Sequence, residues 1–227
     1  MDESDTFAVM RAEMVSNQIA RRGLREPGLL QAFQQVPRHL FVPESMRAHA
    51  YEDRPLPIGM GQTISQPYIV ALMTSLLRLK GGETILEIGT GSCYQSAILS
   101  RLAGKVYTIE RVCELADLAK DRLANLGYSN VQVFCEDGSK GWPPAAPFNG
   151  ILVTAAAAAA PQPLLDQLTD GGRLIAPVGN LYGQMLQLWT REKGHLDCQD
   201  IIPVSFVPLR GKYGWSLEDW ELPGNSP

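Results

Sequence analysis

The 227-residue sequence predicts an α/β fold with a doubly wound, mostly parallel sheet of seven strands. Short apolar runs alternate with helical stretches from residue 83 onward. These runs are almost continuously apolar, which is typical of strands covered by helices on both faces. The first run ends in a glycine-rich turn, GTG at 89–91, which is the usual opening of the following helix in such sheets.

The N-terminal region is predicted to be mainly helical. Apolar residues at helical spacing predict a helix over 6–22, with Asp5 as its N-cap, and a shorter helix over 27–35. A third helix is predicted over 66–78, where apolar side chains gather on one side.

The segment 36–67 is rich in proline and glycine and shows little periodicity. Long irregular stretches inside a compact domain are often functional. We therefore expect residues 51–64 to close over a ligand as a lid. The alternative is a surface loop packed by Tyr51 and Ile58.

The α/β core begins at residue 83. The expected strands are 84–89, 105–110, 131–136, 149–154 and 172–178, with helices over 93–103, 111–126 and 161–169. After residue 178 the helices stop, and two segments, 184–190 and 200–208, predict an antiparallel pair at the sheet edge. We expect one domain, with an N-terminal helical and lid region over 1–82, the core over 83–215 and a tail over 216–227.

Composition bounds the possible partners. The net charge is −4 and no basic stripe is present, so no nucleic-acid partner is expected. The N-terminus lacks a basic region followed by an apolar one, and no apolar run approaches the ~20 residues of a membrane span. The cysteines and histidines do not have zinc-ligand spacing, so no metal is expected. We expect four reduced cysteines in a cytoplasmic monomer.

The glycine turn indicates which nucleotide cofactor the sheet binds. A dinucleotide turn would have its last glycine at position 94, which is Tyr94, and no phosphate-binding lysine is present. Glu87, Gly89 and Gly91 instead fit the E-x-G-x-G-x-G turn of S-adenosylmethionine enzymes, although the third glycine position holds Cys93. An ordinary strand-to-helix turn is the alternative.

Two acidic residues at strand ends support an adenosyl ligand. Glu110 lies about 20 residues after Gly89, the spacing of an acid that binds ribose hydroxyls. Asp137 and Gly138 follow the third strand, where the carboxylate can accept from the adenine amino group and the glycine leaves room for the base. A plain Asp-Gly turn is the alternative.

These residues belong to longer stretches that resemble the bacterial protein-L-isoaspartate O-methyltransferases. The stretches are PRHLFVP, AYEDRPLPIGMGQTISQPYIVALM, ILEIGTGSCYQSAIL, DGSKGW, APFNGILVTAAA, PQPLLDQL, GGRLIAPVG and FVPLRG. The run PIGMGQTISQP is the most specific, and the resemblance covers about residues 14 to 215.

The resemblance implies a fold of the class I S-adenosylmethionine methyltransferase type, with S-adenosyl-L-methionine as methyl donor and S-adenosyl-L-homocysteine as product. It implies isoaspartyl residues in damaged proteins and peptides as methyl acceptors, and repair to aspartate through a succinimide. The alternatives are an O-methyltransferase for a dedicated peptide or small carboxylate, and a non-catalytic binder of S-adenosylmethionine.

Carried over position by position, the resemblance implies Ser65 as the active-site serine. It implies a cofactor site of Thr63, Ile64, Glu87, Gly89, Thr90, Gly91, Glu110, Arg111, Asp137 and Gly138. It implies a substrate site of Gln62, Ser65, Val207, Pro208, Leu209 and Arg210.

The expected reaction requires no strong general base. A carboxylate acceptor has a pKa near ~4 and is ionised at neutral pH, so alignment of the reacting atoms dominates catalysis. Ser65 is then expected to orient the acceptor carboxylate. The alternative is that Ser65 only caps the helix that follows.

Three departures from the family pattern stand out: Cys93, the alanine run Ala155–Ala160, and Arg210. A side chain at position 93 would narrow the cofactor pocket or move the helix. If its φ is positive, it also carries a conformational cost that glycine avoids. Arg210 would either pair with a substrate carboxylate or lie on the surface.

Overall fold

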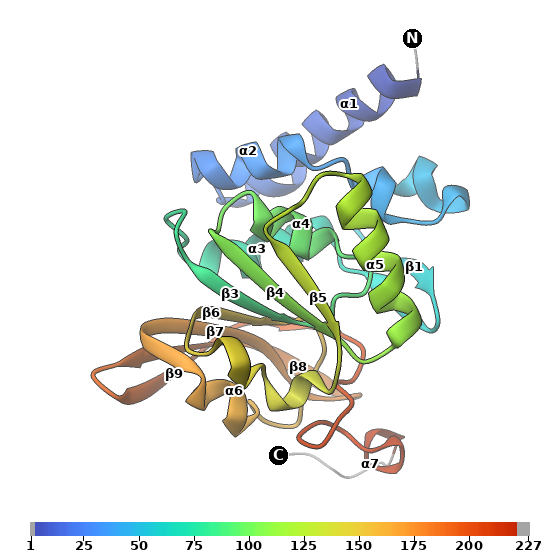
Figure 1. Cartoon of the computed structure of the whole chain (residues 1–227). Coiled ribbons are helices and arrows are strands. Elements are labelled where there is room, and N and C mark those ends of the chain that lie inside the picture. Colours follow the sequence, from blue (N-terminus) through green and yellow to red (C-terminus); the bar gives the residue numbers. More distant parts are fainter. Residues whose placement is uncertain (1–2, 222–227) are drawn as a thin grey trace.

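The computed structural model describes residues 3–221 and has a seven-stranded sheet at its centre (Figure 1). The strands are β3 (Thr84–Ile88), β4 (Lys105–Glu110), β5 (Val131–Cys135), β6 (Phe148–Val153), β7 (Leu168–Asn180), β8 (Gly183–Glu192) and β9 (His195–Val204). Their order in the sheet is β5-β4-β3-β6-β7-β8-β9. Strands β3 to β7 pair in parallel, and β8 and β9 add an antiparallel pair at one edge. The predicted fold class is confirmed.

The strand order reverses between β3 and β6. From β3 the chain moves outward through β4 to β5, and it then returns to place β6 on the other side of β3. Helices that leave β3 and β6 therefore diverge, and the carboxyl ends of the two strands border a crevice, the usual ligand site of such sheets.

Helices cover both faces of the sheet (Figure 1). The helices of the core are α3 (Pro67–Leu76), α4 (Tyr94–Ser100), α5 (Cys113–Asn125) and α6 (Gln162–Asp166). Alternate residues of β3 serve the two faces, because Ile85 packs with α3 whereas Leu86 and Ile88 pack with α6.

The N-terminal helical region begins earlier than expected. Helix α1 (Glu3–Glu13) continues into a π-helical segment, Met14–Ile19, and a 3-10 turn, Ala20–Arg22. Asp5 thus lies inside the helix and is not its N-cap, so that prediction was wrong. Helix α2 (Pro27–Gln35) has the predicted bounds.

The predicted lid region contains regular structure. Two 3-10 turns, Arg38–Phe41 and Glu44–His49, precede a hairpin of β1 (Leu56–Gly59) and β2 (Gln62–Ile64). The irregular loop expected over 51–64 is therefore partly a hairpin. These strands have four and three residues, which is too short for an alternating pattern to stand out in the sequence.

The C-terminal segment after β9 contacts residues that follow β5 and β6, at the carboxyl ends of these strands. Further 3-10 turns at Gly138–Lys140 and Pro143–Ala145 connect β5 to β6, and a short helix α7 (Leu217–Glu221) ends the described chain. The last six residues of the predicted tail lie outside the described residues.

Two of the cysteines are bonded to each other. Cys113 and Cys135 form a disulfide across a Cα–Cα distance of 5.1 Å, so the expectation of four reduced cysteines was wrong. Glu110 at the end of β4 pairs with Cys135 at the end of β5, and this register brings the start of α5 beside β5. Cys93 is free and buried, and Cys198 is free and exposed.

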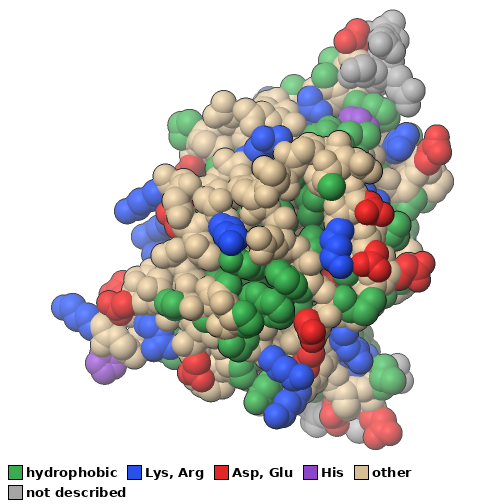
Figure 2. All heavy atoms as spheres, viewed as in Figure 1, with side chains coloured by type: hydrophobic (Ala, Val, Ile, Leu, Met, Phe, Trp, Pro, Cys, Tyr) green, Lys and Arg blue, Asp and Glu red, His purple; other side chains and the backbone are tan. Residues whose placement is uncertain are grey.

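The described surface is mixed in charge. On the face drawn in Figure 2, basic and acidic side chains are interspersed around apolar ones. Within residues 3–221, no helix has the length and apolar character needed to cross a bilayer. The same residues contain no group of three or more His, Cys, Asp or Glu arranged to hold a metal ion.

Candidate active site

A cleft lies at the crevice between the carboxyl ends of β3, β4 and β6. Its lining includes Gln62, Thr63, Ile64, Ser65, Glu87, Gly89, Thr90, Gly91, Glu110, Arg111, Gly138, Val207, Pro208, Leu209 and Arg210. Predicted cofactor and substrate residues from separate parts of the sequence therefore line one cleft. Asp137 is the one predicted site residue that does not line the cleft.

The glycine turn after β3 is shaped by contact with β6. Gly89 has φ of +95°, a conformation that side chains rarely adopt, and a Cβ atom there would collide with the hydroxyl of Thr154. That hydroxyl donates to the carbonyl oxygens of Ile88 at 3.0 Å and Gly89 at 2.6 Å. The turn is therefore fixed against the neighbouring strand.

Glu110 is buried at the end of β4 and holds two loops. Its Oε2 accepts from the backbone N–H of Gly91 at 2.9 Å, and its Oε1 accepts from that of Val112 at 2.9 Å. A carboxylate has about four acceptor positions, so both oxygens retain capacity for hydroxyl donors from the cleft.

Glu87 is a buried carboxyl at the floor of the cleft. Its Oε2 accepts from the hydroxyl of Ser96, and its Oε1 has no hydrogen-bond partner within residues 3–221. Burial raises the pKa of Glu87 to about 8, against the opposing effect of the nearby hydroxyls of Ser96 and Thr108, which favour the ionised form. The group is therefore poised to ionise when a cation approaches.

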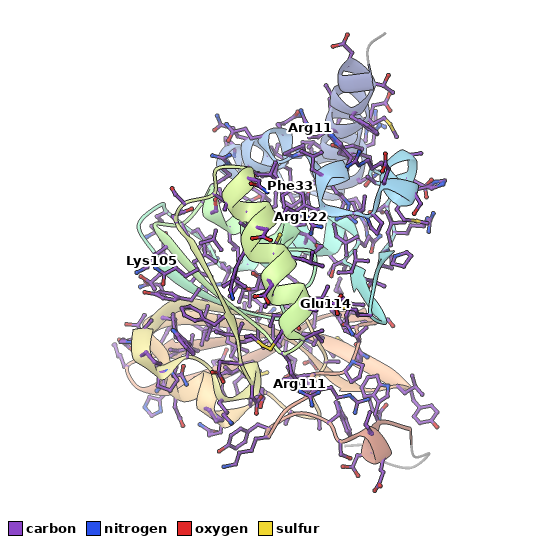
Figure 3. The ribbon with its side chains drawn as sticks, turned by 45° about the vertical axis from the view of Figure 1, so that its right-hand side comes forward. Arg11, Phe33, Lys105, Arg111, Glu114 and Arg122 are labelled. Carbon is purple, nitrogen blue, oxygen red and sulfur yellow. A yellow bond between two sulfur atoms is a disulfide. The ribbon has the colours of Figure 1, made fainter. Side chains whose placement is uncertain are left out.

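Cys93 adopts the conformation that a glycine would favour. It has φ of +59°, is fully buried and forms the N-cap position of α4, and its N–H donates to the carbonyl oxygen of Thr90 at 2.8 Å. Arg122 reaches from α5 toward this turn and donates to the carbonyl oxygen of Ser92 at 3.0 Å (Figure 3). Burial raises the pKa of the Cys93 thiol to about 12, so the group is a thiol and not a thiolate at neutral pH.

Tyr94 is accommodated by the N-terminal region. Its ring is 1% exposed and makes edge contacts with Phe33 and Phe41, with centroids 6.1 Å and 5.5 Å away. The guanidinium of Arg38 lies 4.9 Å from the ring centroid. The Tyr94 ring, which is too large for a dinucleotide turn, thus packs the N-terminal region against α4.

Ser65 lies between β2 and α3 and is half-buried in the cleft wall. The N-cap of α3 is Gln66, with Pro67 as the first helical residue, and no side chain caps this helix. The Ser65 hydroxyl makes no hydrogen bond to residues 3–221, whereas its carbonyl oxygen accepts from Arg38. The geometry does not support the alternative in which Ser65 serves as the helix cap.

The segment Val207–Arg210 forms the opposite wall, beside the alanine run. The N–H of Ala156 donates to the carbonyl oxygen of Val207 at 2.8 Å, and the N–H of Leu209 donates to that of Ala156 at 2.7 Å. Arg210 donates to the carbonyl oxygens of Trp215 and Ser216, so its guanidinium already holds the chain that follows.

Comparison with known proteins identifies the family. The model of the protein-L-isoaspartate(D-aspartate) O-methyltransferase family matches residues 10–214. The chain belongs to this family. A protein-L-isoaspartate O-methyltransferase of Methanospirillum hungatei is 55% identical over 208 residues, which cover 92% of this chain and 96% of that one. One of Geobacter metallireducens is 51% identical over 214 residues, with 94% and 99% covered.

Solved structures of the same family have the same fold. One protein-L-isoaspartate O-methyltransferase superposes with a TM-score of 0.81 at 28% identity and covers 90% of this chain and 67% of that chain. A putative member from Plasmodium falciparum, in complex with S-adenosyl-L-homocysteine, has a TM-score of 0.77 at 26% identity, with 87% and 97% covered.

In this family member, Asp137 faces the C-terminal segment. Its Oδ1 accepts from the N–H and hydroxyl of Ser139 at 3.0 Å and 2.6 Å, and its Oδ2 accepts from the N–H of Lys212 at 2.9 Å. Partial burial opposes ionisation, but these hydrogen bonds and the nearby Lys140 outweigh it and lower the pKa of Asp137. Gly138 does line the cleft, and a Cβ there would press on Ile88.

Several lining residues of the methyltransferase cleft were not predicted. They are Val70, Ile88, Ser92, Tyr94, Gln95, Ile109, Val112, Thr154 and Ala155. Thr154 and Ala155 stand at the carboxyl end of the strand expected over 149–154, and ligands bind at the carboxyl ends of strands in such sheets, so this position was a signal for them. Val70 and Gln95 lie inside helices, where the sequence offers no sign that they reach the cleft.

Proposed function

We propose that this chain transfers a methyl group from S-adenosyl-L-methionine to the carboxylate of L-isoaspartyl residues in damaged proteins and peptides. One observation carries the proposal: Ser65 and the Val207–Arg210 segment line the same cleft as the glycine turn. A donor site and an acceptor site are thereby adjacent, as a direct transfer requires.

The cleft residues fit the proposed methyl donor, which carries its methyl group on a positively charged sulfur. The glycine turn leaves space for close approach of a ligand, and Glu110 offers acceptor capacity for ribose hydroxyls. The unpartnered Oε1 of Glu87 faces the place where the cationic methionine part would lie, and that cation would favour ionisation of a carboxyl that burial otherwise keeps protonated at neutral pH. Thr63, Ile64, Thr90, Arg111 and Gly138 complete the proposed cofactor site.

The chain's own residues act mainly by positioning. The acceptor carboxylate is ionised at neutral pH, and Ser65 offers a hydroxyl with no competing partner in residues 3–221 to orient it. Gln62 and the Val207–Arg210 segment border the place where the peptide would lie. Orientation of this kind can account for roughly 7–11 kcal/mol of barrier reduction.

The remaining expectations concern the context of the enzyme. We propose that residues 1–227 act as a single methyltransferase domain, in which 1–82 supply the wall around Ser65 and 83–215 supply the donor site. We propose a cytoplasmic monomer whose macromolecular partners are its isoaspartyl substrates, with no nucleic-acid or membrane partner.

The deciding experiment measures transfer of labelled methyl groups to an isoaspartyl peptide and to its aspartyl twin. We expect labelling of the isoaspartyl peptide only, and loss of the label as the ester forms a succinimide. Calorimetric binding of S-adenosyl-L-homocysteine in the same preparation controls for folding. Absence of turnover by protein that binds this product would refute the proposal.

The same preparation separates the alternatives. Ala155 lines the cleft within a run that departs from the family pattern, which favours a second candidate, an O-methyltransferase for a dedicated peptide or small carboxylate. Labelling of another member of a panel of carboxylates would support that candidate. Tight binding of S-adenosyl-L-homocysteine without any acceptor would support a non-catalytic binder.

A further inference from the structure

The segment that follows β9 lines the cleft with residues 207–210 and is held at two places. We call residues 206–216 the C-terminal arm. Its first attachment is to the alanine run, where Ala156 exchanges backbone hydrogen bonds with Val207 and Leu209. Because Pro208 lies between them and lines the cleft, this attachment fixes the arm at the proposed peptide site.

The second attachment is made by two side chains after β5. The carboxylate of Asp137 accepts from the N–H of Lys212 at 2.9 Å. The hydroxyl of Ser139 accepts from the N–H of Tyr213 at 3.0 Å and donates to Asp137. Asp137 and Ser139 together form a hook that satisfies two successive backbone donors of the arm, about 75 residues later in the chain.

The arm is shaped to fit this hook. Gly211 has φ of +147°, and a Cβ there would collide with the Asp137 carboxylate and the Ser139 hydroxyl. Ser139 is fully buried, and the backbone of Leu209 also accepts from the N–H of Trp215 at 2.8 Å. A glycine at the point of closest approach and a buried serine indicate a built contact and not a chance one.

The hook gives Asp137 a role different from that of an adenine acceptor. Its side chain does not line the cleft, whereas the next residue, Gly138, does. Both carboxylate oxygens already accept hydrogen bonds from Ser139 and the arm. These hydrogen bonds, and its absence from the cleft lining, direct the carboxylate toward the arm that borders the proposed peptide site.

We propose that Asp137 is a positioning residue for the acceptor peptide, which fixes the C-terminal arm beside the cleft through the N–H of Lys212. The proposal rests on the proposed methyl transfer to isoaspartyl peptides. It assigns Asp137 to acceptor binding and leaves the affinity for the adenosyl ligand to Gly138, Glu110 and the glycine turn.

The test compares Asp137→Ala with the parent enzyme in two assays. We expect the KM for an isoaspartyl peptide to rise about tenfold or more, because a charge-assisted hydrogen bond is lost. The dissociation constant of S-adenosyl-L-homocysteine should change by less than about threefold. Asp117→Ala, which removes an exposed carboxylate from α5, is the matched control and should alter neither value.

Two further variants act on the hook without removing the carboxylate. Ser139→Ala removes the acceptor for Tyr213, and Gly211→Ala forces the arm away from Asp137. Both should raise the peptide KM with kcat changed less than KM. Asp137→Asn retains an acceptor oxygen for Lys212 and should recover part of the loss.

The placement of the arm can also be measured without turnover. In Asp137→Ala, amide hydrogen exchange at Lys212 and Tyr213 should accelerate about tenfold or more, while exchange in β3 and β4 stays unchanged. A tenfold loss of product affinity with normal peptide KM would restore the adenine role and overturn the proposal, as would unchanged exchange at these amides. If the parent enzyme lacked isoaspartyl activity, the proposed function and the acceptor role of Asp137 would both fail, whereas the exchange result would still test the attachment of the arm by Asp137.

Discussion

The guanidinium of Arg38 donates to the carbonyl oxygen of Ser65 across 2.8 Å and to that of Ala50 across 2.7 Å. Arg38 is fully buried, and burial lowers its pKa to about 10, so it remains charged at neutral pH. The backbone of Ser65 is therefore anchored from behind, while its hydroxyl carries no hydrogen bond to residues 3–221. An anchored serine with an uncommitted hydroxyl suits the orientation of an acceptor group.

The first prediction concerns that hydroxyl. Ser65→Ala should lower kcat/KM for an isoaspartyl peptide by about tenfold or more, because an orienting donor to a carboxylate is lost. Binding of S-adenosyl-L-homocysteine should be nearly unchanged, since the backbone of Ser65 stays in place. Steady-state kinetics and calorimetry measure the two effects, with Ser129→Ala, an exposed serine after α5, as control. Full activity of Ser65→Ala would remove this residue from the mechanism.

Cys93 provides a prediction about strain. A side chain at φ of +59° costs on the order of 1 kcal/mol, which glycine avoids. This strain is present with and without ligand, and Cys93 is not among the lining residues of the cleft, so Cys93→Gly should bind S-adenosyl-L-homocysteine at least as tightly as the parent. Cys93→Ala keeps the strain but removes the thiol, so calorimetry on the pair separates the two. Weaker binding in both variants would mean that the buried thiol contributes favourably.

Glu87 makes stability depend on pH. Its pKa rises from 4.5 to about 8 on folding, so the folded state holds the proton more tightly than the unfolded chain. The resulting stabilisation is complete below pH 4.5 and is lost as the pH rises through about 8. Glu87→Gln stays neutral and avoids this loss.

Thermal unfolding between pH 5 and pH 8 tests whether the contribution of Glu87 to stability falls as the pH rises. The Tm of Glu87→Gln relative to that of the parent should increase with pH, by about 2–4 °C for each kcal/mol of stability that the parent loses. Glu114→Gln, at an exposed position in the first turn of α5, should give a flat difference. Parallel curves for Glu87→Gln and the parent would contradict the raised pKa.

The disulfide predicts sensitivity to reductant. Cys113 and Cys135 are 22 residues apart, and closing a loop of that size stabilises a protein by about 3 kcal/mol. Cys113 follows Arg111 and Val112 of the cleft wall, and Cys135 lies three residues before Gly138. Reduction should therefore lower the Tm and weaken binding of S-adenosyl-L-homocysteine.

Cysteine variants identify the bond responsible. Cys113→Ser with Cys135→Ser should reproduce the Tm of the reduced parent and no longer respond to reductant. Cys198→Ser, at an exposed free cysteine, should respond as the parent does. A parent Tm that is the same with and without reductant would show that the bond does not stabilise the fold in solution.

The sheet could be predicted because each strand is recognisable from its own short stretch of sequence. Each buried strand is a continuous apolar run, and the turn at Gly89 carries its own signature. The hairpin around Met60 was missed because its strands are very short. The disulfide was missed because it depends on which strands are neighbours, and only the register of β4 with β5 brings Cys113 to Cys135.

The lining residues of the site could be predicted in large part, but the contacts that depend on the folded backbone could not. The resemblance placed Ser65 and Val207 in one site, and both line the cleft. The contacts of Asp137 could not be predicted, since its partner Lys212 donates from a backbone N–H that has no sequence signature. The role of Arg38 could not be predicted either, because arginine is mostly exposed in proteins and the burial of Arg38 is known only from the structure.

The side chains of strand β9 affect whether another polypeptide can pair with this edge of the sheet. It is one free edge of the sheet, and its exposed positions include Asp197, Asp200 and Pro203. Charged side chains and a residue without an N–H make an edge a poor template for a further strand. This edge is therefore protected against pairing with an extended segment of another polypeptide.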